Sequence, residues 1–304
     1  MNIHLENVDL KSTTGPNHFA SKLIKYMSRD NITFDSKLKP DARLCFIETR
    51  NHDDKTPLIQ RLDGIYFNTT QNYMLQNMNI SKTYENSSGV VYQTDFNKDL
   101  ITKYFGTHEN STVIRNGADL DFIKSIKPVE NKAFDKYDNI WCCASSWRPH
   151  KRLEDNIRYF LEHSSSKDLL VVAGHVEIKK YKNDRIAYVG QLSIDQLVSL
   201  YKKSNYFLHL AWLDHCPNVV VDARASGCKI VCSSSGGTKE IAGLEAVVIE
   251  EEEWDFEPVD LYNPPKLDFS KKIENKFDSE LCMTKVGRQY KKFVADTLNE
   301  NFYS

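Results

Sequence analysis

Hydrophobic and polar residues in the second half of the chain follow a pattern that predicts strands and helices in strict succession. The run 138–146 (DNIWCCASS) is apolar enough for a strand buried on both faces. The segment 153–163 (LEDNIRYFLEH) carries apolar residues at helical spacing. Further strands are expected in 167–174, 185–190, 205–212 and 229–234, and further helices in 193–204 and 218–226. This order is typical of a doubly wound parallel sheet, so we expect the α/β fold class.

The first half of the chain also indicates the α/β fold class, but its pattern of strands and helices is less regular. A helix is expected over 16–27, with Pro16 in its first turn, and another over 95–106. Strand-like runs occupy 43–49, 57–62, 89–94 and 111–116. A polar stretch around Pro128 has no periodicity and separates the halves. We therefore expect an N-terminal domain over 1–127, a linker over 128–137, a second domain over 138–278 and a C-terminal helix over 279–304.

Composition narrows the class of protein. The 304 residues are 40% hydrophobic and 27% charged, with a formal net charge of -2, so there is no general attraction to nucleic acid. The N-terminus lacks the features of a secretory signal, and no apolar run is long enough to span a membrane. Seven cysteines without a CxxC pair argue against a disulfide scaffold and favour the cytoplasm. An amphipathic face on 16–29 leaves peripheral membrane contact open.

Two loops of the second half would lie beyond the carboxyl ends of strands, where open parallel sheets bind ligands. The loop SSWRPHKR (145–152) contains Arg148 and Lys151, whose charges suit a diphosphate, although a solvated basic turn is the alternative. The loop VGQLS (189–193) contains Gly190 and offers an edge against which a nucleobase could rest.

A third loop, DHCPNVVVDARASG (214–227), places Asp214 and Asp222 with seven residues between them at the start of an expected helix. Carboxylates in this position can accept hydrogen bonds from sugar hydroxyls. The helix start would add free backbone N–H groups at Asn218, Val219 and Val220. The alternative is that Asp214 caps the helix and Asp222 is only exposed.

The fourth loop is SSSGGTKE (233–240). Gly236 and Gly237 would let the backbone approach a ligand closely before the next helix begins near Thr238. A different acidic pair, Asp119 and Asp121, forms a DxD sequence of the kind that holds a metal in other transferases. Because it follows the turn Asn116-Gly117, we interpret it as a loop and expect no metal site.

Taken in order, WRPHKR, YVGQLS, DHCPNVVVDARASG and SSSGGTKEIAG resemble the donor domain of the retaining glycosyltransferases of the large family 4. In the first half, STTGPNHFASKL, RLDGIYFN, YQTDFNK and VIRNGAD resemble the same family. The resemblance implies the GT-B architecture, with two Rossmann-like domains facing a cleft and the C-terminal helix packing back on the N-terminal domain. It also implies transfer of a hexose or related sugar from a UDP- or GDP-linked donor to a hydroxyl of a glycan or other acceptor, with retention of configuration and without a metal or cofactor.

The resemblance assigns roles to the four loops. Lys151 and Arg148 would neutralise the leaving diphosphate, Asp214 would bind a hydroxyl of the donor sugar, and Asp222 would bind the ribose. The further donor-binding residues would be Asn218, Val219, Val220, Gly190, Gly236, Gly237 and Thr238. On the acceptor side the candidates are Gly15, His18 and Asp63. The sequence departs from the family in having Asp instead of Glu at both acidic positions and in placing Arg148 and Lys151 only three positions apart.

Other functions remain open at this level. A sugar-nucleotide epimerase of the same architecture would convert its substrate without an acceptor. A phosphorylase would need a lysine motif that anchors its cofactor, and the sequence shows none. A non-catalytic protein that binds sugar nucleotides is a third alternative, supported by the shorter acids. The sequence does not fix the nucleotide, the sugar or the acceptor.

Overall fold

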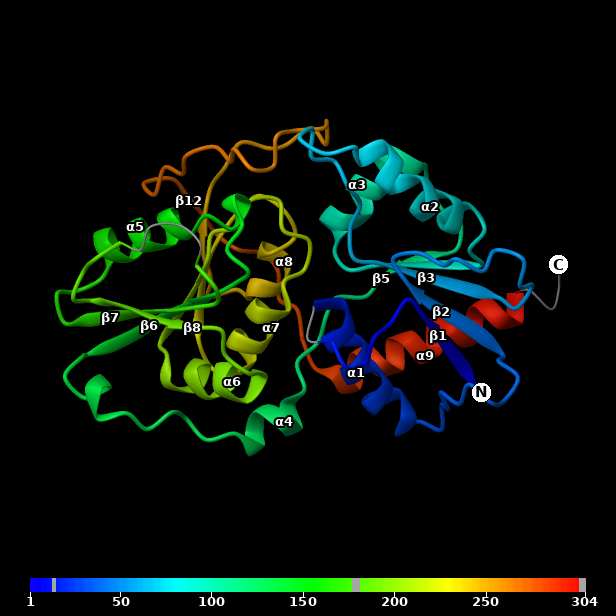
Figure 1. Ribbon diagram of the computed structural model, residues 1–304, viewed down its shortest axis with the longest axis horizontal. Coiled ribbons are helices and arrows are strands. Elements are labelled where there is room, and N and C mark those ends of the chain that lie inside the picture. The colour runs from blue at the N-terminus through cyan, green and yellow to red at the C-terminus, as the bar shows by residue number, and fades with distance from the viewer. Residues whose placement is uncertain (13–14, 177–180, 301–304) are drawn as a thin grey trace. The chain divides into compact units, whose positions relative to one another are not determined.

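A computed structural model describes residues 1–12, 15–176 and 181–300. The chain forms two compact units (Figure 1). Unit 1 comprises Met1–Gly117, Phe256–Val259 and Leu281–Ser304, and unit 2 comprises Ala118–Asp255 and Asp260–Glu280. The division falls after Gly117, before the boundary expected at residue 127. The expected linker is part of unit 2, because the segment before η1 (Lys132–Phe134) is bonded to a helix of that unit: Val129 N–H donates to the Ser199 carbonyl at 3.1 Å.

Unit 1 contains a parallel five-stranded sheet in the order β1-β2-β3-β4-β5. Its strands are β1 (Ile3–Glu6), β2 (Ala42–Phe46), β3 (Leu58–Leu62), β4 (Gly89–Tyr92) and β5 (Ser111–Val113). Helices α1 (Gly15–Ser28) and α9 (Met283–Glu300) cover one face, and α2 (Tyr73–Glu85) and α3 (Asp95–Phe105) cover the other (Figure 1). A parallel bridge between Asn2 and Thr33 extends the sheet beyond β1.

The core of unit 1 explains why α1 and α9 form. The apolar side of α1, including Phe19 and Leu23, is buried together with Tyr290 and Val294 of α9. The rings of Phe19 and Tyr290 lie 6.0 Å apart. The expected helix at the C-terminus therefore packs on the N-terminal sheet, within unit 1. The amphipathic face seen in 16–29 is part of this core.

Unit 2 contains a seven-stranded sheet in the order β12-β11-β10-β9-β6-β7-β8. Its strands are β6 (Asn139–Ala144), β7 (Asp168–Ala173), β8 (Ile186–Gly190), β9 (Tyr206–His209), β10 (Lys229–Ser233), β11 (Val247–Ile249) and the antiparallel β12 (Lys272–Ile273). The helices are α4 (Leu120–Ser125), α5 (Leu153–His163), α6 (Ile194–Lys203), α7 (Asn218–Ala225) and α8 (Lys239–Ala242). The strand order reverses direction between β6 and β9. This is the switch point at which open α/β sheets bind ligands.

The elements expected from the sequence of unit 2 are present, often to within a residue or two. α5 covers the predicted segment 153–163, and its face carrying Leu153, Ile157 and Phe160 is buried. Helix α2 of unit 1 was not expected. Its buried positions include Asn77 and Thr83, so the sequence has no apolar stripe at helical spacing there.

Candidate functional site

The loops after β6 and β9 meet at the switch point of the unit 2 sheet. The first ends in a short 3-10 turn, η2 (Pro149–Lys151), and the second leads into α7. The backbone N–H of Trp212 donates to the carbonyl of His150 at 2.7 Å. Lys151 Nζ donates to Asp214 Oδ2 at 2.6 Å, and both side chains are largely buried. The structure thus brings together two site residues that the sequence placed in separate loops.

Gly236 allows the loop after β10 to pack closely against the backbone of Asp214. Its φ of 77° is in the left-handed region, and a Cβ there would lie 2.5 Å from the Asp214 carbonyl oxygen. The N–H of Gly237 donates to the same oxygen at 2.8 Å. Gly236 and Gly237 therefore bring their loop into close contact with the Asp214 backbone. The loops after β6, β9 and β10 all meet at this residue.

Asp214 lies among donors that keep it ionised. His209 Nε2 lies 2.8 Å from Asp214 Oδ2, and the backbone N–H of His215 donates to Oδ1 at 3.1 Å. Burial raises the pKa of Asp214, but the Lys151 charge and the His209 hydrogen bond outweigh it and hold this pKa well below its usual range. Burial lowers the pKa of His209, so its ring is neutral at neutral pH and donates through Nε2.

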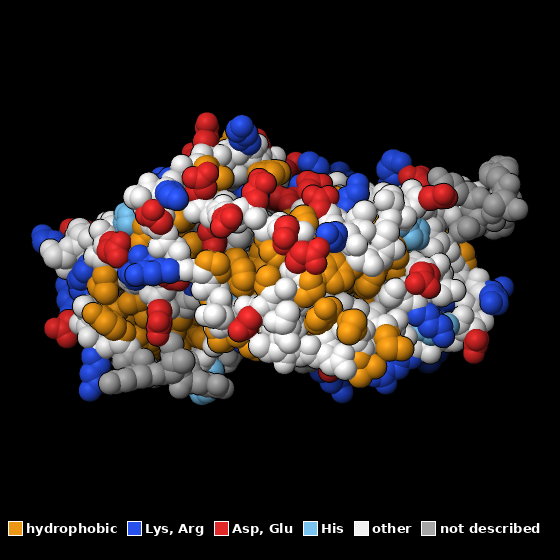
Figure 2. Space-filling view, turned by 90° about the horizontal axis from the view of Figure 1, so that it is seen from above, with side chains coloured by type: hydrophobic (Ala, Val, Ile, Leu, Met, Phe, Trp, Pro, Cys, Tyr) orange, Lys and Arg blue, Asp and Glu red, His pale blue; other side chains and the backbone are white. Residues whose placement is uncertain are grey.

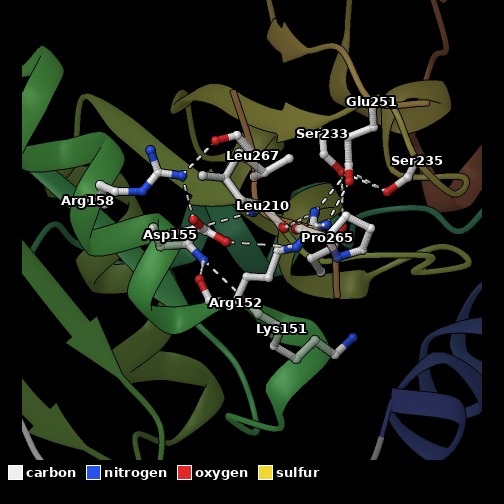
Figure 3. A network of polar contacts seen from close by, with 12 residues as sticks. Lys151, Arg152, Asp155, Arg158, Leu210, Ser233, Ser235, Glu251, Pro265 and Leu267 are labelled. Carbon is white, nitrogen blue, oxygen red and sulfur yellow. Dashed lines mark hydrogen bonds and ion pairs between the residues drawn. The ribbon is translucent and has the colours of Figure 1, made fainter. Parts of the chain in front are cut away.

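Arg152 connects the η2 turn to two other segments. It has a left-handed φ of 51°, and only 1% of its side chain is exposed. Its guanidinium pairs with both carboxylate oxygens of Glu251, at 2.9 and 2.6 Å, and donates to the carbonyls of Leu210 and Pro265 (Figure 3). Ser235 Oγ donates to the same carboxylate at 2.7 Å. This buried network therefore fixes the basic turn relative to the small-residue loop.

The side chain of Lys151 does not bond to the Arg152 and Glu251 pair, although its backbone carbonyl accepts a hydrogen bond from Asn156 Nδ2 at 3.2 Å. Figure 3 shows its side chain pointing away from the Arg152 guanidinium. Arg148, the other cation of the loop, precedes the η2 turn, is exposed, and forms no ion pair with any residue that the structure describes. The two candidate cations therefore differ, because only Lys151 is held beside an acid.

The start of α7 provides fewer free donors than expected. Pro217 precedes the helix, and its carbonyl accepts the N–H of Val220 at 3.0 Å. Val220 is therefore not one of the free donors that the sequence suggested. Asn218 and Val219 are the first two residues of the helix and are partly buried.

Asp222 lies in the second turn of α7 and is partly buried. Burial raises the pKa of the Tyr201 hydroxyl well above its usual value, and the Asp222 charge contributes in the same direction. The Asp222 carboxylate is therefore close enough to Tyr201 of α6 to influence its pKa.

Two further candidates lie on neighbouring loops. Thr238 is fully buried, and its Oγ1 has no hydrogen-bond partner in the described part of the chain. Gly190 ends β8 with a φ of 71°, and a Cβ there would meet open space. Beside it lies a mainly apolar hollow of about 420 Å³, lined by Val189, Leu192 and Gln196 together with residues of the segment 126–134.

In unit 1, Asp63 follows β3 and belongs to a polar network. Its Oδ1 accepts hydrogen bonds from Arg61 and Gln93, whereas Oδ2 is buried without a partner among the described residues. Arg61 is 1% exposed, lies over the ring of Phe19 at 4.1 Å and donates to Asn116 Oδ1 at 2.8 Å. The Asp63 carboxylate is therefore held by neighbouring side chains of unit 1, and its role on the acceptor side stays a prediction.

The other acceptor-side candidates lie at the start of α1. Gly15 is its first residue, and His18 is partly buried in its first turn. Thr13 and Thr14 of the same motif lie outside the described residues. A polar hollow of about 550 Å³ lies at the carboxyl ends of β1 and β2, lined by Glu6, Asn7, Glu48, Thr49, Arg50 and Asn51. The sequence did not single out these residues.

The DxD sequence has a structural explanation. Asp119 caps α4 by accepting the N–H of Phe122 at 3.1 Å. Within the described ranges, no group of three or more His, Cys, Asp or Glu side chains is arranged to hold a metal ion. In the same ranges, no helix is long and apolar enough to cross a membrane. On the face shown in Figure 2, Lys and Arg side chains are scattered among Asp and Glu.

The histidines of the site predict a loss of stability in acid. Burial lowers the pKa of His150 to about 3 and that of His215 to about 4, and it also lowers the pKa of His209. In the unfolded chain these rings take up protons near pH 6.5, so their contribution is complete above that pH and is lost as the pH falls below it. Each contributes a slope of at most about 1.4 kcal/mol per pH unit.

We therefore expect the free energy of unfolding, measured with urea between pH 6.5 and 5, to fall steeply. His150→Leu should reduce the slope, because it removes one of the buried rings whose pKa is lowered. An unchanged slope in His150→Leu would contradict this assignment.

Sequence reasoning missed His209, Arg152 and Glu251. His209 lay inside a run interpreted as a buried strand, and the only signal was a polar residue at the carboxyl end of that strand. Arg152 and Glu251 are 99 residues apart, so no local pattern could join them.

These features define an α/β protein whose second unit holds a charged, buried site at its switch point. Residues 126–255, which include all four loops, match the family model described as glycosyl transferases group 1. The resemblance stated from the sequence is confirmed over this segment. No curated protein matches the sequence.

Solved structures show the same fold. Anabaena HepE in complex with UDP-glucose is 13% identical, with 99% of this chain and 100% of that chain covered and a TM-score of 0.63. Sucrose-phosphate synthase from Thermosynechococcus elongatus is 12% identical over 83% and 86% of the two chains, with a TM-score of 0.64. AviGT4, a glycosyltransferase involved in avilamycin A biosynthesis, is 12% identical over 98% of both chains, with a TM-score of 0.62. The expected fold class, α/β of the GT-B type with two Rossmann-like parallel-sheet units, is confirmed.

Proposed function

We propose that this chain transfers a hexose or related sugar from a nucleotide-sugar donor to an acceptor hydroxyl, with retention of configuration and without a metal. The observation that carries the proposal is the buried pair of Lys151 and Asp214 at the switch point of unit 2. A cation and an acid side by side suit a donor that combines a diphosphate with a sugar. The similarity to HepE, whose structure contains UDP-glucose, supports a UDP-linked donor, and a GDP-linked donor is the alternative.

Each residue has a physical task in this proposal. Lys151, assisted by Arg148, stabilises the negative charge that grows on the leaving diphosphate. Asp214 accepts a hydroxyl of the donor sugar through Oδ1, and Asp222 accepts the ribose hydroxyls. Backbone N–H groups of Asn218, Val219, Gly236 and Thr238 contact the phosphates or the sugar, while Gly190 borders the nucleobase.

The reaction needs no side-chain nucleophile in this scheme. The acceptor hydroxyl attacks the anomeric carbon from the side on which the diphosphate leaves, and a phosphate oxygen takes its proton. On the acceptor side, Gly15, His18 and Asp63 are proposed to lie close to the acceptor. We place the reaction in the cytoplasm, with a glycan or another hydroxyl compound as acceptor.

The function is tested with a panel of UDP- and GDP-linked sugars. At least one should raise the melting temperature of the full chain and support sugar transfer or slow donor hydrolysis. Because Lys151 and Arg148 supply the positive charge, the activity should survive EDTA. Loss of activity in EDTA that manganese restores would contradict metal independence, and absence of binding by the whole panel would contradict the donor class.

Substitutions of Asp214 and Asp222 should have different effects on kcat and on the donor KM. Asp222 would bind the ribose, which does not change during the reaction, so Asp222→Asn should raise the donor KM more than it lowers kcat. Asp214 lies beside the sugar, whose ring gains positive charge in the transition state, so Asp214→Asn should mainly lower kcat. If Asp214→Asn keeps kcat within about twofold of wild type, a change below roughly 0.5 kcal/mol, this acid has only a structural role.

An epimerase is distinguished by turnover of the sugar nucleotide without an acceptor. A non-catalytic binding protein would be stabilised by the donor but would show neither transfer nor hydrolysis.

A further inference from the structure

Three donors surround the Asp214 carboxylate, and they are not equivalent. Lys151 Nζ and His209 Nε2 both lie against Oδ2, at 2.6 and 2.8 Å. The third donor, the backbone N–H of His215, contacts Oδ1 at 3.1 Å. The orientation of Asp214 therefore depends on what holds Oδ2.

Lys151 is the less permanent of the two partners on Oδ2. In the proposed function its ammonium is also the charge that faces the leaving diphosphate, and a lysine has a long flexible stem. Its side chain is 19% exposed, whereas that of His209 is 5% exposed. When Lys151 turns to the phosphate, His209 is the partner that stays.

The fold holds the His209 ring in place. His209 is the last residue of β9, and it lies in register with Cys232 of the neighbouring strand β10. The ring is parallel to that of Phe207 at 6.3 Å. A short, rigid side chain at the end of a central strand is a better anchor than a flexible one.

The charge state of His209 also suits this task. Burial lowers its pKa, so the ring donates an N–H without adding a positive charge. A second cation on Oδ2 would reduce the negative charge that Asp214 presents to the sugar. A neutral donor fixes the carboxylate and leaves that charge intact.

We propose that His209 is a positioning residue that directs Asp214 Oδ1 toward the donor sugar while Lys151 serves the diphosphate. This inference rests on the proposed function for its catalytic meaning. Its structural part, that the Asp214 rotamer depends on His209, is independent of the proposed function.

The structural part is tested with ligand-free crystals of the full chain carrying Lys151→Ala, so that His209 is the remaining side-chain donor to Asp214 Oδ2. Two His209 variants are made in this background. His209→Phe keeps the ring volume and removes the N–H, while His209→Gln offers an amide N–H. Asp214 should leave its present rotamer in the Phe variant and keep it in the Gln variant. An unmoved Asp214 in a folded His209→Phe variant overturns the proposal.

The catalytic part is tested by steady-state kinetics with the best donor of the panel. His209→Phe should lower kcat about tenfold to a hundredfold, the range for losing a hydrogen bond to a charged group, with the donor KM changed less than about threefold. His209→Gln should recover kcat to within about threefold of wild type. His163→Phe, far along α5, is the control and should match wild type.

The outcomes separate the two ideas. If wild type transfers sugar and Asp214→Asn lowers kcat, but His209→Phe retains it, only the positioning role is wrong. If no donor of the panel binds to wild type, the proposed function fails, and the crystals still decide whether His209 holds Asp214.

Discussion

Replacing Glu251 by glutamine should lower the free energy of unfolding by up to about 3–5 kcal/mol, because it leaves the buried Arg152 charge with only the more distant carboxylate of Asp155, at 3.9 Å, as a counter-ion. The two side chains are 7% and 1% exposed and share two hydrogen bonds, at 2.9 and 2.6 Å. Glutamine keeps the shape of the side chain, so the effect reports the charge and not a cavity. Urea unfolding of the full chain measures it.

Two controls isolate the buried pair. Glu253→Gln changes an exposed acid nearby and should shift stability by less than about 0.5 kcal/mol. The double variant Arg152→Met with Glu251→Leu removes both charges and should be less destabilised than Glu251→Gln alone. A loss below about 1 kcal/mol in Glu251→Gln would show that water or another group compensates the arginine.

The sequence predicted unit 2 better than unit 1 for a physical reason. Strands such as β6 and β7 are buried on both faces and read as continuous apolar runs, and α5 and α6 carry one apolar face each. The capping box at the start of α6, with Ser193 and Gln196, is a local signal as well. In α2 the exposed side chains include Met74, Leu75 and Met78, while buried positions are polar, so periodicity gave no helix.

The candidate site was also predictable only in part: the sequence located its loops but not the contacts between them. Loops at strand ends can be located from the order of elements, which is why Lys151 and Asp214 were found. Their direct contact could not be foreseen, because it depends on the reversal of strand order between β6 and β9. The structural reason for a glycine at position 236 could not be predicted either. The atoms that leave no room for a Cβ there belong to the backbone of Asp214, 22 positions away along the chain.

Removing the Lys151 ammonium should have the largest effect on catalysis of any single change in the site. Lys151→Ala should lower kcat/KM by about 30-fold to 1000-fold, which corresponds to about 2–4 kcal/mol of lost transition-state stabilisation. Arg148→Ala should cost less, because the exposed guanidinium is screened by water. Lys167→Ala, at the exposed amino end of β7, is the matched control and should match wild type.

A double-variant cycle decides whether Lys151 acts on the diphosphate or only through Asp214. If the lysine served merely to hold the acid, Lys151→Ala combined with Asp214→Asn would be no worse than Asp214→Asn alone. If it stabilises the leaving group, the lysine variant should remain strongly impaired in the Asp214→Asn background, because the diphosphate still loses its counter-charge. We expect the second result, with only part of the two effects shared through their 2.6 Å contact. An Arg148→Ala effect larger than that of Lys151→Ala would assign the diphosphate to the arginine instead.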